Sequence, residues 1–324
     1  MRLSASIAVV ALIALNANTA QAWGALGHTL TGQIAQQFLT PTTASKVGQI
    51  LPAADDGLLS DVASWADKIR FLASFKWATP MHFFNPVGDD PPDHCTAGYV
   101  YAGQDNVNAV LNMTATLKEY EAKAPKTNAS ATVRQQALMF FVHFMGDIHQ
   151  PLHDSSRLRG GNDAPIKWGK AKNNLHSMWD TLLIEKDVTD RFGGDPDAYL
   201  NDTLNLAHTY WTDAPTWTDC DPAQNTATTP WSATTDSVKT LCPIQWAADT
   251  NALDCSVVWV DYSPTRDYST DYFQSVTGPS SSYLLQKQLA KSGVRMAAVL
   301  NEIYDPSAKP PLTKRGLARL PSEH

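Results

Sequence analysis

Residues 141–153 read FVHFMGDIHQPLH. The apolar residues that precede and fill the first part of this stretch predict a helix that is buried on nearly every side, in the middle of a domain. His143 and Asp147 are four residues apart, so their side chains lie on one face of this helix. Pro151 ends the helix and turns the chain, which brings His153 near the same point. A buried imidazole and carboxylate need a partner for their charge, and a divalent cation is the simplest one.

The pair also fits a core histidine that is satisfied by a neighbouring aspartate. The rest of the chain favours a metal, because His176 and Asp180 repeat the four-residue spacing on a second predicted helix. Three further stretches place His28, Asp67 and His82 in apolar or aromatic surroundings. Imidazole and carboxylate suit zinc, and a set without thiolates leaves coordination positions open to water, which points to catalysis. A zinc protease or a phosphoesterase would fit this set, and the absence of an HExxH motif weakens the protease reading.

The first 22 residues have the features of a secretory signal peptide. Arg2 precedes an apolar run from Ile7 to Leu15, and small residues lead up to Ala22. We expect cleavage after Ala22, so that residues 1–22 are removed and the exported protein begins at Trp23. No later stretch of the sequence has the ~20 apolar residues that a membrane span requires.

Several other features suit the secretory route. Three sequons predict N-glycosylation at Asn112, Asn128 and Asn201. Four cysteines in an oxidising compartment predict two disulfides, for which the sequence alone allows three pairings. A mature chain of about 300 residues predicts one domain, or at most two intimate ones.

The charge balance limits how the protein can hold a substrate. The chain has 25 Lys and Arg against 32 Asp and Glu, a net charge of −7. Such an acidic protein has no general attraction for nucleic acid or an anionic membrane. A phosphate-bearing substrate would therefore have to be held locally, by metal or by a few placed donors.

The secondary-structure pattern is mostly helical. Apolar residues at helical spacing over 107–117 and 285–303 predict two long helices. Residues 85–103 and 212–240 are predicted to be long loops that the cysteines pin. The Pro- and charge-rich residues 305–324 are predicted to form a disordered tail outside the folded core.

Six motifs carry a resemblance to a known family. They are WGALGH at 23–28, ASWAD at 63–67, HF at 82–83, VHFMGD at 142–147, QPLH at 150–153 and LHSMWD at 175–180. In this order they are similar to the zinc-dependent single-strand-specific nucleases, the type I nucleases of moulds and plants, which also have 3′-nucleotidase activity. The resemblance implies an all-α, phospholipase C/nuclease-like domain over residues 23–304. It also implies a cofactor of three Zn²⁺.

The resemblance implies a division of the ligands among the zincs. One zinc would be held by Asp67, His82, His143 and Asp147, and a second by His153, His176 and Asp180. The third would be held by the amino group and carbonyl of Trp23, by His28 and by the shared Asp147. Asp67 would orient a hydroxide towards phosphorus, and the third zinc would stabilise the departing 3′ oxygen. Arg70, one turn beyond Asp67, would bind a phosphoryl oxygen or else face solvent.

The resemblance also bears on substrate contacts and disulfides. Phe83 would stack on a base, the alternative being a core phenylalanine. Asn85 stands where fungal members have an Asp that reads the base edge, which leaves base preference open. Asn162 is a candidate polar contact at the scissile site. His149 is expected to support a ligand rather than bind metal, and His94, His208 and His324 are expected to be exposed in loops or the tail. The contexts PPDHC and NALDC imply that Cys95 pairs with Cys255, which leaves Cys220 for Cys242.

We therefore expect a secreted monomeric zinc endonuclease that converts single-stranded DNA and RNA to 5′-phosphate products and also acts on 3′-nucleotides. The first alternative is a phospholipase C-like zinc phosphodiesterase, which would need a cation cage for choline and an apolar interfacial surface. The second is a secreted zinc-binding protein without enzymatic activity. We expect no membrane partner.

Overall fold

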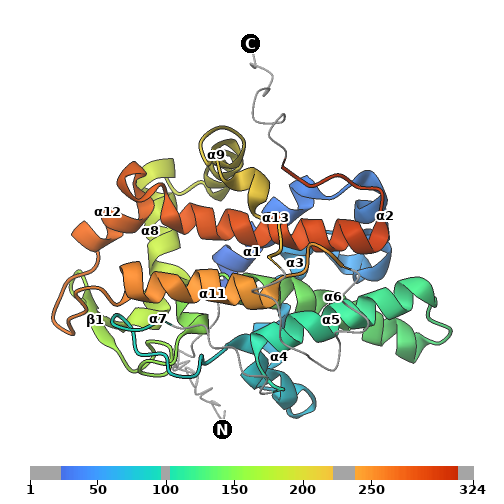
Figure 1. Ribbon diagram of the computed structural model, residues 1–324, viewed down its shortest axis with the longest axis horizontal. Helices are drawn as coiled ribbons and strands as arrows, with labels where there is room; N and C mark the ends of the chain where they lie inside the picture. Colours follow the sequence, from blue (N-terminus) through green and yellow to red (C-terminus); the bar gives the residue numbers. More distant parts are fainter. Residues whose placement is uncertain (1–22, 96–102, 222–237, 313–324) are drawn as a thin grey trace, which may run out of the picture.

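A computed structural model describes residues 23–95, 103–221 and 238–312 of the 324-residue chain. The predicted signal peptide, residues 96–102 and 222–237 of the two predicted long loops, and residues 313–324 lie outside the described residues. The described chain is a helical assembly (Figure 1). Its α-helices are α1 (Ala25–Phe38), α2 (Pro41–Ile50), α3 (Leu59–Val62), α4 (Trp65–Ile69), α5 (Asn106–Ala122), α6 (Asn128–Asp147), α7 (Leu175–Ser177), α8 (Leu183–Phe192), α9 (Pro196–Thr209), α11 (Pro243–Leu253), α12 (Asp271–Thr277) and α13 (Leu284–Tyr304).

Shorter helical turns connect these helices. The 3₁₀ turns are η1 (Ala53–Asp55), η2 (Ala73–His82), η3 (Pro151–Asp154), η5 (Ala214–Thr216) and η7 (Pro279–Ser281). Two further segments, η4 (Met178–Leu182) and η6 (Asp254–Val258), are π-helical. One antiparallel hairpin consists of β1 (Pro165–Trp168) and β2 (Ala171–Asn174). The all-α prediction is confirmed, although it missed this hairpin.

Helix α6 forms as predicted and is central to the fold. A capping box starts it, in which the Thr127 and Ser130 side chains bind each other's backbone N–H groups. From Ala137 to Asp147 every residue of α6 is buried, as expected of a helix inside a domain. The helix ends at Asp147, four residues before Pro151, where the end was expected, and Pro151 instead begins η3.

The core has two large apolar clusters that meet at α1 and α13. One cluster fills the space among α5, α6 and the C-terminal half of α13. The other packs α1, α8 and α12 against the N-terminal half of α13. Figure 1 shows α13 along the length of the molecule with α1 beside it. The site described below lies where α1 and α6 meet.

Both disulfides have the predicted pairing. Cys95 is bonded to Cys255 and ties the loop after η2 to η6. Cys220 is bonded to Cys242 at the start of α11. Apart from the bridge between Asp90 and His94 and the turn η5, the described parts of the two predicted loops have no helix or strand, as expected. No helix of the described chain is long and apolar enough to cross a membrane.

Two expectations are wrong at single residues. Leu312, within the predicted tail, is buried in a small cluster with Trp211 and Trp217, whereas residues 305–311 are exposed or half-buried. His208 is neither in a loop nor exposed; it lies in α9, half-buried, with its ring 5.7 Å from that of Phe38. His94 is exposed as expected, and His324 lies outside the described residues.

Candidate metal centre and substrate pocket

The eight predicted side-chain ligands gather into three groups. Within each group, the donor atoms lie within 4.8 Å of one another. The groups are Asp67, His82 and His143; His28, His143 and Asp147; and His153, His176 and Asp180. All eight side chains are buried, and they come from seven helical elements of the chain.

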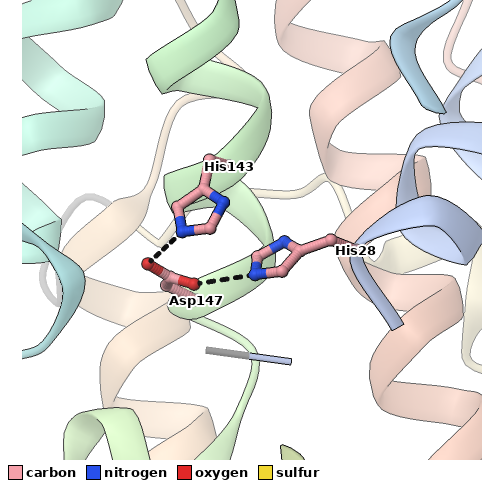
Figure 2. Close-up of side chains that lie close together, drawn as sticks. All are labelled: His28, His143 and Asp147. Atoms are coloured by element: carbon pink, nitrogen blue, oxygen red, sulfur yellow. Dashed lines mark ion pairs between the residues drawn. The ribbon is translucent and has the colours of Figure 1, made fainter. Parts of the chain in front are cut away.

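His143 belongs to two of these groups, and Asp147 lies beside it in one of them. The two carboxylate oxygens of Asp147 lie 3.3 Å from His28 Nε2 and 3.4 Å from His143 Nε2. Figure 2 shows that His28 reaches Asp147 from α1, whereas His143 reaches it from one turn earlier on α6. Asp67 Oδ1 lies 3.8 Å from Nε2 of both His82 and His143. His143 Nε2 therefore lies between Asp67 of one group and Asp147 of the other.

The third group depends on a π-helical turn. His176 is the middle residue of the short helix α7, and Asp180 lies in η4, where the wider turn is of the kind often found at functional sites. Asp180 Oδ2 lies 3.3 Å from His176 Nε2, and Oδ1 lies 3.7 Å from His153 Nε2. Gln150 Nε2 donates a hydrogen bond of 2.5 Å to Asp180 Oδ1 and fixes the carboxylate.

Backbone carbonyls orient four of the five imidazoles. The Nδ1 atoms of His82, His143, His153 and His176 bind the carbonyl oxygens of Ala78, Ala63, His82 and Gly160 at 2.9, 2.7, 2.5 and 2.6 Å. A carbonyl oxygen can only accept a hydrogen bond, so each Nδ1 carries the proton and each Nε2 has a free lone pair. In each of the four histidines, the free lone pair is therefore on Nε2, the atom that points towards the other side chains of its group.

The buried donor atoms otherwise lack partners. No hydrogen bond within the described chain reaches Nε2 of His28, His82, His143 or His153, either oxygen of Asp147, or Asp180 Oδ2. Buried polar atoms in native proteins almost always have a partner, so a cluster of unpaired acceptors requires an explanation. Bound metal ions provide that explanation, because each of these atoms is a metal donor. The residues present therefore fit a metal centre.

Burial holds the groups in a neutral state when no metal is bound. It lowers the pKa of His143 to about 3 and that of His153 to about 4. It also raises the pKa of Asp180 to about 7 and that of Asp147 well above its ordinary value. The imidazoles are thus in their ligand form at neutral pH, whereas the carboxyl groups need a cation to ionise fully.

Two glycines allow this packing. A Cβ on Gly146 would lie 2.6 Å from His28 Nδ1, so only glycine lets the imidazole pack against α6. Gly160 lies in a run of four residues, 158–161, with φ of +46°, +55°, +59° and +78°. This left-handed turn directs the Gly160 carbonyl at His176, and a Cβ on Gly160 would collide with the Leu152 carbonyl.

A pocket of about 410 Å³ opens beside the groups. His82, His153 and His176 line it, together with all four of the predicted substrate contacts, Arg70, Phe83, Asn85 and Asn162. The ring of Phe83 is 40% exposed, which excludes a core phenylalanine. The Arg70 side chain is only 10% exposed and lies 3.3 Å from Asp67 Oδ1, so it does not simply face solvent.

Two residues lie close to the groups without entering them. His149 is buried but binds the Met145 carbonyl (2.8 Å) and Arg295 (3.0 Å), and it belongs to none of the three groups, as expected. Trp23 is fully buried. The next residue, Gly24, donates its N–H to the carbonyl oxygen of Asp180 at 2.6 Å, which holds the start of the described chain against a ligand-bearing segment.

Sequence reasoning missed the residues that position the ligands. Gln150 gave a signal, because it is a polar residue inside the QPLH motif, between His143 and His153. Gly146 gave a weaker one, as a glycine within an apolar helix and directly before Asp147. The orienting carbonyls gave none, because every residue has one.

A helical fold with three buried His and Asp groups beside an open pocket is an arrangement that suits a metal-dependent hydrolase. The family profile of the S1/P1 nucleases matches residues 23–305, and the chain belongs to that family.

Several relatives match over most of their length. The chain is 31% identical to nuclease PA3 of a Penicillium species and to nuclease P1 of Penicillium citrinum, over 87% of this chain and 98% of each relative. It is 30% identical to endonuclease 4 of Arabidopsis thaliana, over 90% and 92%. The solved alpha toxin of Clostridium absonum is 14% identical, with a TM-score of 0.41, covering 91% of this chain and 67% of the toxin.

Proposed function

We propose that the protein is a secreted zinc-dependent endonuclease that hydrolyses single-stranded DNA and RNA to 5′-phosphate products and also removes phosphate from 3′-nucleotides. Family membership supports nucleic acid as the substrate. The observation that carries the zinc chemistry is the set of buried, unpaired imidazole and carboxylate atoms beside an open pocket. The aromatic Phe83 in that pocket supports specificity for single strands, because only an unpaired base can stack on it.

We assign the ligands to three zinc ions. Asp67, His82, His143 and Asp147 would hold the first, and His153, His176 and Asp180 the second. The third would be held by His28, by Asp147 and by the amino group and carbonyl of Trp23. When bound, zinc supplies the positive charge that activates water and stabilises the departing oxygen.

The remaining work falls to side chains that line or border the pocket. The Asp67 carboxylate accepts a hydrogen bond from the attacking water and orients it towards phosphorus. Arg70 is fixed by Asp67 at 3.3 Å and donates to a phosphoryl oxygen, which places the phosphate next to that water. Phe83 stacks on the neighbouring base. Asn85 and Asn162 contribute polar contacts without adding negative charge to an already acidic protein.

The N-terminus belongs to the same proposal. Removal of residues 1–22 would give Trp23 a free amine, and the family match starts at Trp23. The exposed side chains of Asn128 and Asn201 are accessible to glycosylation, whereas Asn112 is half-buried on α5. We further propose that the protein acts as a monomer in the extracellular space.

One substrate panel tests this function. Purified zinc-loaded protein is given a single-stranded DNA, the same sequence as a duplex, an RNA, a 3′-nucleotide and phosphatidylcholine. We expect rapid cleavage of the single strands, slow cleavage of the duplex, release of phosphate from the 3′-nucleotide and no action on the lipid. Products with 3′-phosphates, preference for the duplex or hydrolysis of the lipid would contradict the proposal.

A further inference from the structure

The β1–β2 hairpin carries a concentration of positive charge that the proposed function has not used. It lies between Asn162, which lines the substrate pocket, and the candidate ligand His176. Lys167, Lys170 and Lys172 are all exposed on it, and none of them forms an ion pair within the described part of the chain. The protein has a net charge of −7, but these three lysines within six residues give the hairpin a local positive charge.

The pairing of the two strands places like charges opposite each other. In the antiparallel register Lys167 faces Lys172 directly. Side chains of directly opposed residues lie on the same face of a hairpin, and like charges in that position are destabilising. Pro165 and Asn174 share this outer face, whereas Ile166 is buried on the other. The Lys167–Lys172 pair therefore does not contribute to the stability of the hairpin, which suggests another role for it.

The same outer face forms one wall of a groove that adjoins the substrate pocket. The groove has a volume of about 330 Å³ and is lined by Asn162, Asp163, Pro165, Lys172, Asn173 and Asn174. Asn162 lines both the groove and the pocket, so the two adjoin at this residue. The groove therefore offers a path away from the metal groups and past Lys172, which faces Lys167 across the hairpin.

The acidic groups on this side already have partners. Asp163 is ion-paired with Arg159 at 3.0 Å, and Arg159 itself lines the substrate pocket. Asp267, which lies near Lys167, accepts hydrogen bonds from the N–H groups of Gly169 and Ser269, both at 2.9 Å. Asp267 still offsets part of the charge of Lys167, whereas Lys172, which lines the groove, forms no ion pair within the described residues and is available to a ligand.

We propose that the outer face of the β1–β2 hairpin, through Lys167 and Lys172, binds backbone phosphates of a single-stranded nucleic acid that continues out of the substrate pocket past Asn162. This inference rests on the proposed function and adds the path of the strand to it. It gives an acidic enzyme a local attraction for a polynucleotide that a dinucleotide is too short to use. Long substrates are thereby favoured over short ones at low salt.

The test compares an oligonucleotide of about twelve nucleotides with a dinucleotide, using zinc-loaded full-length protein. The variants are Lys172→Gln, the double variant Lys167→Gln/Lys172→Gln, and the charge-conserving Lys172→Arg. Lys126→Gln is the matched control, because Lys126 is an exposed lysine between α5 and α6, at the other end of the molecule from the hairpin (Figure 1). For each protein, kcat/KM is measured for both substrates between about 50 and about 200 mM salt.

We expect the wild type and the Lys126→Gln and Lys172→Arg variants to lose oligonucleotide cleavage steeply as salt rises. Each lysine removed from the hairpin should reduce that loss by about threefold over this salt range and lower the oligonucleotide-to-dinucleotide ratio of kcat/KM at low salt. Equal salt slopes in the wild type and the double variant would overturn the inference and leave the nuclease function standing. Cleavage of neither substrate by the wild type would overturn the proposed function and the inference together.

Discussion

In four of the five candidate metal-binding histidines, a backbone carbonyl accepts a hydrogen bond from Nδ1, and this bond determines which ring nitrogen can bind metal. Because Nδ1 is occupied, each of these rings can present only Nε2 to the group it faces. His28 differs, because neither of its ring nitrogens has a hydrogen-bond partner within the described chain, and its position depends on packing against Gly146. Each group also contains a carboxylate. Replacing a carboxylate by its amide changes the charge of the side chain but keeps its shape.

Asp67→Asn keeps the shape of the side chain but removes a carboxylate that faces His82, His143 and Arg70. An amide is a poor zinc ligand and cannot accept a proton, so we expect turnover on single-stranded DNA to fall by roughly a hundredfold or more, with little change in the circular dichroism spectrum. Asp61→Asn is the matched control, because Asp61 is exposed on the neighbouring helix α3. Similar losses in the two variants would show that Asp67 has no special role.

Zinc uptake should release protons in a manner that depends on pH. Burial raises the pKa of Asp180 to about 7 in the metal-free protein, so at pH 6 most of this carboxyl is protonated and must ionise when it binds a cation. The imidazoles of His143 and His153, with pKa values lowered to about 3 and about 4, are already neutral there. Apparent zinc affinity should therefore rise as pH increases from 6 to 8. Calorimetry in buffers of different ionisation enthalpy would detect the protons, and equal release at pH 6 and pH 8 would contradict the assignment.

At the scale of elements, the site depends on how closely two helices approach. Helix α1 brings His28 against α6 at Gly146, and α6 itself supplies both His143 and Asp147. The third group is assembled from shorter pieces, in which the left-handed turn 158–161 orients His176 and the π-turn η4 presents Asp180. These irregular turns occur where a regular helix would not bring the donor atoms together.

Gly146→Ala tests the approach of α1 to α6. The added Cβ would lie 2.6 Å from His28 Nδ1, so the imidazole or the whole of α1 must move. We expect the variant to bind about one zinc fewer per chain and to lose turnover, while the groups that lack His28 stay loaded. In the control Gly48→Ala, the new Cβ on α2 meets only Gly57, at 3.7 Å, and should raise stability by about 0.4–1 kcal/mol. Full zinc content in Gly146→Ala would show that His28 is not a ligand.

At the scale of the whole molecule, the N-terminus is part of the predicted metal centre. A backbone nitrogen can bind zinc only as a free amine, because an amide nitrogen shares its lone pair with the carbonyl. Trp23 is buried and held next to Asp180 by the N–H of Gly24, so its backbone already lies at the metal-binding part of the fold. Export and processing would then complete the active enzyme.

A protein with one extra glycine before Trp23 separates this role from simple packing. It should fold normally, because the core clusters do not depend on the amine, but it should bind the third zinc weakly and lose most of its turnover. Mass spectrometry confirms each N-terminus before zinc content and kcat are compared. Equal zinc content and equal kcat in both forms would make Trp23 a packing residue only.

The sequence predicted which His and Asp side chains gather, because its signals are local. The His-to-Asp spacing of four residues survives folding on α6 and across η4, and the disulfide partners lie in recognisable contexts. The hairpin was missed because β1 and β2 have four residues each, too short for alternation to show. The left-handed turn includes Leu158 and Arg159, which rarely adopt positive φ, so only tertiary packing could reveal it. Leu312 was misassigned because its apolar partners, such as Trp211, are about a hundred residues away.

The most direct test of the central claim is to remove and restore zinc while counting it. Protein stripped by a chelator is titrated with zinc, and zinc per chain, melting temperature and turnover on single-stranded DNA are followed together. The three His and Asp groups predict close to three zincs per chain at saturation, with turnover absent at the start and melting temperature rising as the groups fill. Full turnover in protein shown to contain no zinc would contradict the account.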